Sequence, residues 1–173
     1  MQQSLWDFAV ALYARPGVAE ACLRRQDEED ADVCLLLAAL WLEHRGVAVT
    51  AERVTQLEGL ATPWQTTVST PLRELRRAWK AAAAEDVELG ELRRQLATLE
   101  LQAERILLER LEALSTAWPA DTHHVGRWLE RLDPGHSDDN QAQRAAAHGL
   151  LRDAVGALSP TSAEGPASEQ PAR

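Results

Sequence analysis

The stretch "VCLLLAALWL", residues 33–42, is the longest apolar run in the chain and contains no charged residue, Pro or Gly. Wound as a helix, it is apolar on every face, and such a helix in a soluble protein is buried on all sides. It is about half the length needed to cross a bilayer. We therefore expect a central core helix here, with Asp32 as its N-cap and Gly46 in a left-handed conformation after its last turn.

Helix signals continue on both sides of this segment. Ser4 is placed to cap a first helix that ends at "RPG", residues 15–17, and a second short helix follows from Val18. We expect the second helix to break in the polar run "QDEEDAD", residues 26–32. On the other side, Thr50 begins a short helix, and "TPW", residues 62–64, is a start signal for the next one. Pro71 should kink that helix or split it in two.

A long helix is expected at 87–117. It carries a heptad-like seam in which apolar residues recur in steps of three and four: Leu89, Leu92, Leu96, Leu99, Ala103 and Ile106. The seam is short for a coiled coil, so we expect it to pack inside the chain, although a homodimer is possible. Residues 118–124 form a loop, a short helix follows, and Ser137 caps a last helix. Several Trp residues should pack around the central helix.

Length and composition set the fold class. The chain has 173 residues, 45% of them hydrophobic and 26% charged, and is rich in Leu, Ala, Glu and Arg, which favour helix. We expect an all-α single compact domain of seven or eight helices over residues 1–158. Residues 159–173 are rich in Pro, Ser, Ala and Glu without apolar periodicity, and we expect a disordered tail there.

The sequence predicts a cytoplasmic protein. Its first residues lack the cationic segment of a signal peptide, and no apolar run is long enough to span a membrane. Cys22 and Cys34 are too far apart for a redox pair, so we interpret both as reduced, small packing residues. The net charge of -9 makes nucleic acid an improbable partner for the whole molecule.

Catalytic and metal-binding motifs are missing from the sequence. There is no nucleophile elbow, phosphate-binding loop or dinucleotide fingerprint. The acidic run lacks the Gly and the closing Glu of a calcium loop, and the His123–His124 pair has no acid or Cys at ligand spacing. We therefore predict no catalytic residues, no cofactor and no metal.

The segment "PLRELRRAWK", residues 71–80, is the main candidate for a functional surface. At 100° per residue its four cations share one helix face and form a cation stripe: Arg73, Arg76, Arg77 and Lys80. We expect Leu72, Leu75 and Trp79 to dock the other face onto the core. Because neighbouring like charges repel, the stripe calls for an anion, either internal or external. Asp27 and Asp32 are the candidate internal partners.

Two functions fit the cation stripe. The first is a non-catalytic interaction or adaptor protein that presents the cations to an acidic partner protein. The alternative is an enzyme or binding protein for a small anionic, phosphate-bearing ligand, with the same cations lining a pocket and Asp27 and Asp32 nearby. Arg suits both, because its fork binds carboxylates and phosphates through two hydrogen bonds.

The sequence also resembles a known family. The order "LWDFAVALYARPGVAEACLRRQDEEDADVCLLLAALWLEHRG", then "PWQTTVSTPLRELRRAWK" and "ELQAER", is similar to a proteobacterial family of uncharacterised helical proteins that share a domain of unknown function. The resemblance covers roughly residues 4 to 110. It departs in the loop "QDEEDADV", where a Gly is expected and acids occur instead. It implies a bacterial, cytoplasmic, all-α protein.

Overall fold

The computed structural model describes residues 3–121, 127–135 and 140–158. Within these ranges the regular secondary structure is helical, apart from one isolated β-bridge between Val47 and Ala120. The prediction of an all-α fold is confirmed. The elements are α1 (Leu5–Tyr13), α2 (Val18–Glu29), α3 (Val33–His44), α4 (Ala51–Trp64), the π-helical turn η1 (Gln65–Ser69), α5 (Thr70–Ala78), the 3-10 turn η2 (Ala82–Ala84), α6 (Val87–Ser115), α7 (Trp128–Leu132) and α8 (Gln141–Gly156).

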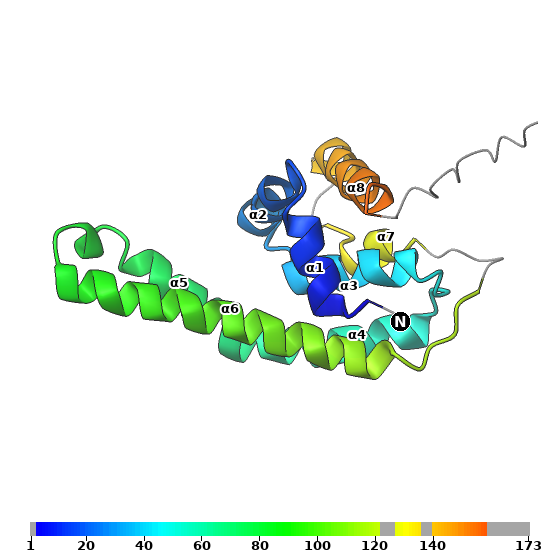
Figure 1. The fold of residues 1–173 in the computed structure, drawn as a ribbon, viewed down its shortest axis with the longest axis horizontal. Coiled ribbons are helices and arrows are strands. Elements are labelled where there is room, and N and C mark those ends of the chain that lie inside the picture. Colours follow the sequence, from blue (N-terminus) through cyan, green and yellow to red (C-terminus); the bar gives the residue numbers. More distant parts are fainter. Residues whose placement is uncertain (1–2, 122–126, 136–139, 159–173) are drawn as a thin grey trace, which may run out of the picture.

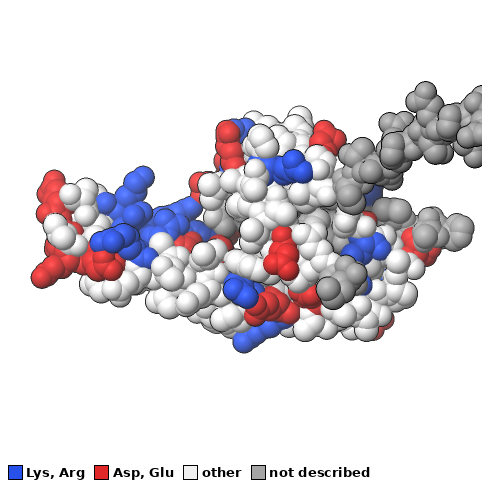
Figure 2. Space-filling model, in the orientation of Figure 1, with Lys and Arg blue, Asp and Glu red and all other residues white. Residues whose placement is uncertain are grey.

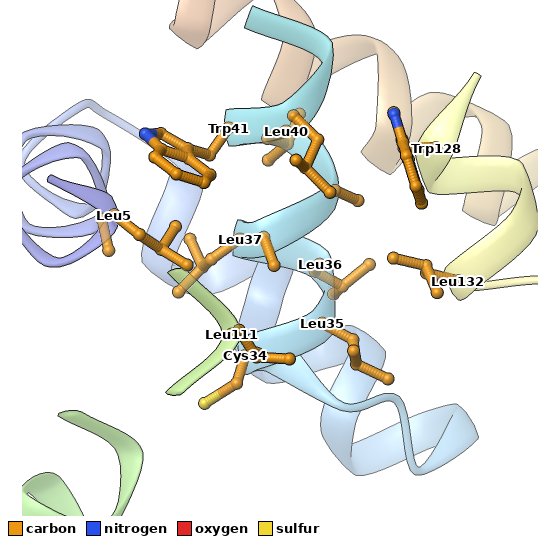
Figure 3. Close-up of a cluster of buried hydrophobic side chains, with 14 of the residues drawn as sticks. Leu5, Cys34, Leu35, Leu36, Leu37, Leu40, Trp41, Leu111, Trp128 and Leu132 are labelled. Carbon is orange, nitrogen blue, oxygen red and sulfur yellow. The ribbon is translucent and has the colours of Figure 1, made fainter. Parts of the chain in front are cut away.

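Helix α3 forms the centre of the core, as its sequence predicts. Every residue from Val33 to Leu42 is buried. Figure 3 shows its side chains meeting Leu5 of α1 on one side and Trp128 of α7 on the other. The expected ends are also present, since Asp32 caps α3 and Gly46 follows it with a φ of 68°.

The two cysteines are free and buried in this core. Burial raises the pKa of the Cys22 thiol to about 11, against a smaller lowering effect of the Tyr13 hydroxyl. Burial likewise raises the pKa of Cys34 well above its ordinary value. Both side chains are therefore protonated at neutral pH and unreactive, as expected for packing residues.

Most of the indoles surround α3. Trp41 and Trp128 are buried, and Trp128 donates its Nε1–H to the backbone carbonyl of Val47 at 2.7 Å. Three further Trp residues are partly buried and pack against the same core: Trp6, Trp64 and Trp118. The expected role of Trp in core packing is thus confirmed, with Trp79 of α5 outside the cluster.

Helix α2 ends inside the polar run 26–32, as the sequence predicts. Its last residue is Glu29, so the first four residues of the run are still helical. Its end is held by tertiary contacts: buried Arg25 pairs with Glu29 one turn later and donates from Nε to Asp133 at 2.9 Å. His148 of α8 also bonds to Asp133, at 2.8 Å from Nε2. This network joins α2 to the C-terminal helices.

Helices α4 and α5 form one continuous helical segment with η1 between them. The predicted start at residues 62–64 is therefore wrong, since Pro63 lies inside α4. Proline has no N–H, so Pro63 leaves the carbonyl of Gly59, four residues earlier, without its usual helical donor. Both residues are exposed, and this carbonyl therefore lies on the solvent side. The irregularity expected at Pro71 is found one turn earlier, in η1, where the N–H of Thr70 bonds to the carbonyl of Gln65.

Helix α6 matches the predicted long helix closely. Its N-terminal half projects with α5 beyond the other helices (Figure 1). The predicted seam is only half buried: Leu96 and Ala103 face the interior, whereas Leu92, Leu99 and Ile106 are exposed. A straight α-helix has 3.6 residues per turn, whereas a heptad seam repeats every 3.5 residues. The buried face of α6 therefore moves away from the predicted seam, and Glu100, Leu107 and Leu111 are buried instead.

Three further predictions fall on residues outside the described ranges: the cap at Ser137, the His123–His124 pair and the tail at 159–173. Among the helices that the structure does describe, none has the length and apolar character needed to cross a membrane.

Replacing Leu36 of α3 by Ala should lower the free energy of unfolding by about 2–5 kcal/mol. The side chain of Leu36 is fully buried, so its truncation leaves a cavity in the core. Leu99→Ala on α6 is the control, since Leu99 is 51% exposed. The control should cost less than about 1 kcal/mol. Urea unfolding followed by circular dichroism measures both, and equal losses would contradict the central position of α3.

Candidate functional site

The π-helical turn η1 decides which residues of α5 face the interior. A π turn contains one more residue than an α turn, so every position after it moves on by one residue around the helix. Ser69 and Arg73 are buried as a result, with Arg73 only 7% exposed, while Leu75 is 41% exposed. The prediction that Leu72, Leu75 and Trp79 dock α5 is therefore wrong for Leu75, because it assumed an uninterrupted α-helix, whereas Leu72 and Trp79 are half-buried.

The cation stripe is divided among different partners. Arg76 binds both carboxylate oxygens of Glu100 on α6, and Arg77 pairs with Asp27 on α2. Lys80 is exposed and forms no ion pair with any residue in the described ranges. Figure 2 shows Lys and Arg side chains gathered over α5 and the adjoining part of α6. The expected internal pairing thus holds for Arg77 and Asp27, and Glu100 is a partner that the sequence did not indicate.

Helix α5 is fixed to α6 by polar contacts around Glu100. Arg93 donates from Nε to the carbonyl of Arg76 at 3.0 Å, and Nε of Arg73 lies 3.5 Å from Glu100 Oε1. Burial and the neighbouring Glu100 raise the pKa of Glu104, and Arg73 and Arg76 oppose that shift. Three guanidiniums, those of Arg73, Arg76 and Arg93, and two carboxylates therefore meet where α5 packs on α6.

Arg73 also lines a cavity of about 310 Å³ between the start of α3 and the α4–η1–α5 segment. We call it the Arg73 pocket. Its walls are mostly polar. The residues that line it are Asp30, Ala31, Asp32, Leu35, Thr62, Gln65, Thr66, Thr70 and Arg73. The described residues contain no group of three or more His, Cys, Asp or Glu side chains that could hold a metal ion.

Asp32 has one carboxylate oxygen engaged and one without a partner. Oδ1 accepts the N–H groups of Cys34 at 2.9 Å and Leu35 at 3.2 Å, which caps α3. Oδ2 is buried and has no hydrogen-bond partner. Burial raises the pKa of Asp32 to about 6, against the lowering effects of the two backbone N–H groups, the Gln65 amide and the Arg73 guanidinium.

Asp30 forms the rim of the pocket in an unusual backbone conformation. It ends α2 with a φ of 53°, in the left-handed region, and the next residue, Ala31, donates its N–H to the carbonyl of Arg25 at 3.3 Å. The family resemblance leads one to expect a Gly in this loop, and Asp30 is the residue of the loop that adopts the left-handed conformation. Asp is among the few side chains that tolerate this region, so the loop keeps the turn and gains an exposed carboxylate.

Arg73 is the least satisfied polar group of the site. A guanidinium has five N–H donors, yet none of the three nitrogens of Arg73 makes a hydrogen bond to a described residue, and its Nε is buried without a partner. Its contact with Glu100 is an ion pair at 3.5 Å, and Glu100 already binds Arg76. Ser69 Oγ, on the same helix face, is also buried without a partner.

A family model described as a protein of unknown function (DUF2390) matches residues 4–111. The chain belongs to this family. No curated protein and no solved structure matches the chain. The Arg73 pocket lies entirely within the DUF2390 region, whereas α7 and α8 lie beyond it.

Sequence reasoning found only part of this DUF2390 site. It selected Arg73 and Asp32, which the structure brings to one pocket, and Asp27, which lies outside it beside Arg77. It missed Asp30 and the polar residues of the α4–η1–α5 segment: Thr62, Gln65, Thr66 and Thr70. The closely spaced Pro63 and Pro71 are the one signal that could have indicated an irregular helix there.

The carboxyl group of Asp32 should make stability depend on pH. Its folded-state pKa of about 6 exceeds the ordinary 3.8, so the folded protein binds the proton more tightly and loses stability as pH rises through this window. Asp32→Asn keeps a good cap without titrating. The free energy of unfolding of this variant, relative to wild type, should increase by roughly 2 kcal/mol between pH 4 and pH 7.

Urea unfolding at pH 4, 5.5 and 7 tests this expectation. Asp86→Asn is the matched control, because Asp86 caps α6 by accepting from Leu89 at an exposed position. The control measures how much an exchange of Asp for Asn at a helix cap changes the free energy of unfolding by itself. If the Asp32→Asn and wild-type curves stay parallel over the whole range, the carboxyl group of Asp32 is not perturbed as described.

Proposed function

We propose that the protein binds a small ligand carrying a carboxylate or phosphate group, with Arg73 as the anchoring residue in the Arg73 pocket. The observation that carries the proposal is a buried guanidinium that makes no hydrogen bond and whose one ion pair, at 3.5 Å, is to a carboxylate that Arg76 already binds. Leaving the donors of a buried charge without acceptors costs more free energy than leaving those of a neutral polar group without them. An acidic ligand would supply acceptors that the described residues do not provide.

Arg25 is an internal comparison for this argument. It is buried to the same degree as Arg73. Its Nε and Nη2 donate to the two oxygens of Asp133, and its Nη1 pairs with Glu29. An arginine that serves the fold of this protein is thus fully paired. Both arginines line a cavity, so the difference lies in their partners: the fork of Arg73 makes no hydrogen bond to a described residue, which favours a role in binding.

The pocket fits a small molecule. Its volume of about 310 Å³ is at the lower end of the range for ligand sites. The hydroxyls of Thr62, Thr66 and Thr70 and the amide of Gln65 can hydrogen-bond a polar ligand. The proposal concerns binding and assigns no reaction.

Isothermal titration with a panel of small acids tests the proposal: inorganic phosphate, acetate, succinate, glutamate and phosphoethanolamine. We expect at least one of them to bind saturably to the wild-type protein. Arg73→Lys should weaken that binding roughly 10-fold or more, because lysine keeps the charge but lacks the planar fork. Lys80→Gln, which removes an exposed cation outside the pocket, should bind like wild type.

A second pair of variants separates binding from folding. Thr66 and Thr67 are both exposed, and their hydroxyls donate to the carbonyls of Thr62 at 2.9 Å and Pro63 at 2.7 Å. Only Thr66 lines the pocket. Thr66→Phe should therefore block binding, whereas Thr67→Phe should not. The proposal is wrong if no panel member binds, or if binding survives both Arg73→Lys and Thr66→Phe.

An acidic partner protein is the second candidate. Arg77 and Lys80 are exposed on α5, and Lys80 has no ion pair within the described residues. These two cations could meet an acidic surface even though Arg73 and Arg76 are turned toward α6.

Affinity capture at low salt tests this second candidate. An acidic protein retained by wild type should be lost with the double variant Arg77→Glu and Lys80→Glu, because the reversed charges repel it. The control makes the same change in charge elsewhere, with Arg24→Glu and Arg131→Glu, which are exposed on α2 and α7. An identical set of captured proteins for both double variants would exclude the cations of α5 as a docking surface.

A further inference from the structure

The Arg73 pocket is lined by groups of both charges whose hydrogen-bonding capacity is not fully used. Asp30 and Asp32 line it together with Arg73. Within the described residues, no ion pair joins Arg73 to Asp30 or Asp32; its one ion pair is with Glu100. Asp32 Oδ2 and Arg73 Nε are both buried without a hydrogen-bond partner. The Arg73 guanidinium lowers the pKa of Asp32, but the two groups make no direct contact that would occupy either of them.

The local charge balance is acidic. The three guanidiniums of the site are Arg73, Arg76 and Arg93, which bonds to the carbonyl of Arg76. The carboxyl groups that line the pocket or act on these guanidiniums are Asp30, Asp32, Glu100 and Glu104. A ligand that is only an anion would bind Arg73 against the repulsion of this excess of carboxylates. A ligand that also carries a cation would meet Arg73 and relieve the repulsion at the same time.

We infer that the ligand of the Arg73 pocket is a small zwitterion, an amine and a carboxylate or phosphate in one molecule. Its acidic group binds Arg73, and its ammonium group binds the carboxylates of Asp30 and Asp32. The inference rests on the proposed function, because it takes Arg73 as the anchor. Free amino acids and phosphorylated amines are the chemical classes that meet this description.

The remaining walls agree with this class of ligand. Thr62, Gln65 and Thr66 add hydroxyl and amide groups to the lining, and Ala31 and Leu35 are its apolar residues. The polar groups can solvate a compact polar molecule. The two carboxylates come from the α2–α3 loop and Arg73 comes from α5, so the ligand would bridge these two segments.

Matched pairs of probes test the inference, each pair differing by the amine alone: β-alanine and propionate, glutamate and glutarate, phosphoethanolamine and ethyl phosphate. Titration of the wild-type protein should show the zwitterion of at least one pair binding roughly 10-fold tighter than its partner. Asp32→Asn should reduce that preference to about 3-fold or less, since it removes one ammonium partner while the helix cap remains.

Two more variants complete the test. Asp30→Gly keeps the left-handed turn, which suits Gly, and should also reduce the preference for the zwitterion. Glu58→Gln neutralises an exposed carboxylate of α4 outside the pocket and should leave the preference unchanged.

Failure of this inference is distinct from failure of the proposed function. If acids without an amine bind equally well and Arg73→Lys weakens them, the pocket is a simple anion site and the inference is overturned. It is likewise overturned if Asp32→Asn and Asp30→Gly both keep the full preference. If zwitterions bind and depend on Asp32 but not on Arg73, the anchoring role of Arg73 is wrong and the proposed function is overturned with it.

Discussion

Helix α3 has no polar face, so it is stable only where other helices cover it on every side. Its surroundings follow from this requirement: α1, α6 and α7 pack against its leucines (Figure 3). The same requirement draws the N-cap of the helix inward. Asp32 has to cap α3 in a place where water is excluded from one of its oxygens, and burial is the main reason for its raised pKa. The central helix therefore contributes to the candidate site through its cap Asp32 and through Leu35.

The protein buries two arginines in different ways. Arg25 sits in a complete network with Glu29, Asp133 and His148 that ties α2 to the C-terminal helices. Arg73 makes no hydrogen bond to a described residue and shares a single carboxylate, that of Glu100, with Arg76. A buried charge that is left unsatisfied lowers stability, and proteins tolerate such sites where binding requires them. This contrast within one chain is the physical basis for placing the ligand at Arg73.

Sequence reasoning identified the right residue types for the site and placed them on the wrong face. Arg73 and Asp32 were selected because cations and acids of this kind need partners. The helical wheel then assigned Leu75 to the core and Arg73 to the surface, and the structure reverses both. The error is one residue, inserted by the π-helical turn at Gln65–Ser69. No periodicity rule reveals such an insertion, because the residues on both sides still follow helical spacing.

Local chemistry by itself determined much of this protein: the all-helical fold, the central position of residues 33–42, the cap at Asp32, the left-handed Gly46 and the extent of the long helix α6. Each depends on short-range propensity, capping or composition, which neighbouring residues express without help from the rest of the chain. Only the tertiary structure decided which charges are buried, which carboxylate each arginine meets and where a cavity remains. Those outcomes depend on helix rotation and on contacts between residues far apart in the chain, such as Arg73 with Glu100 and Arg25 with Asp133.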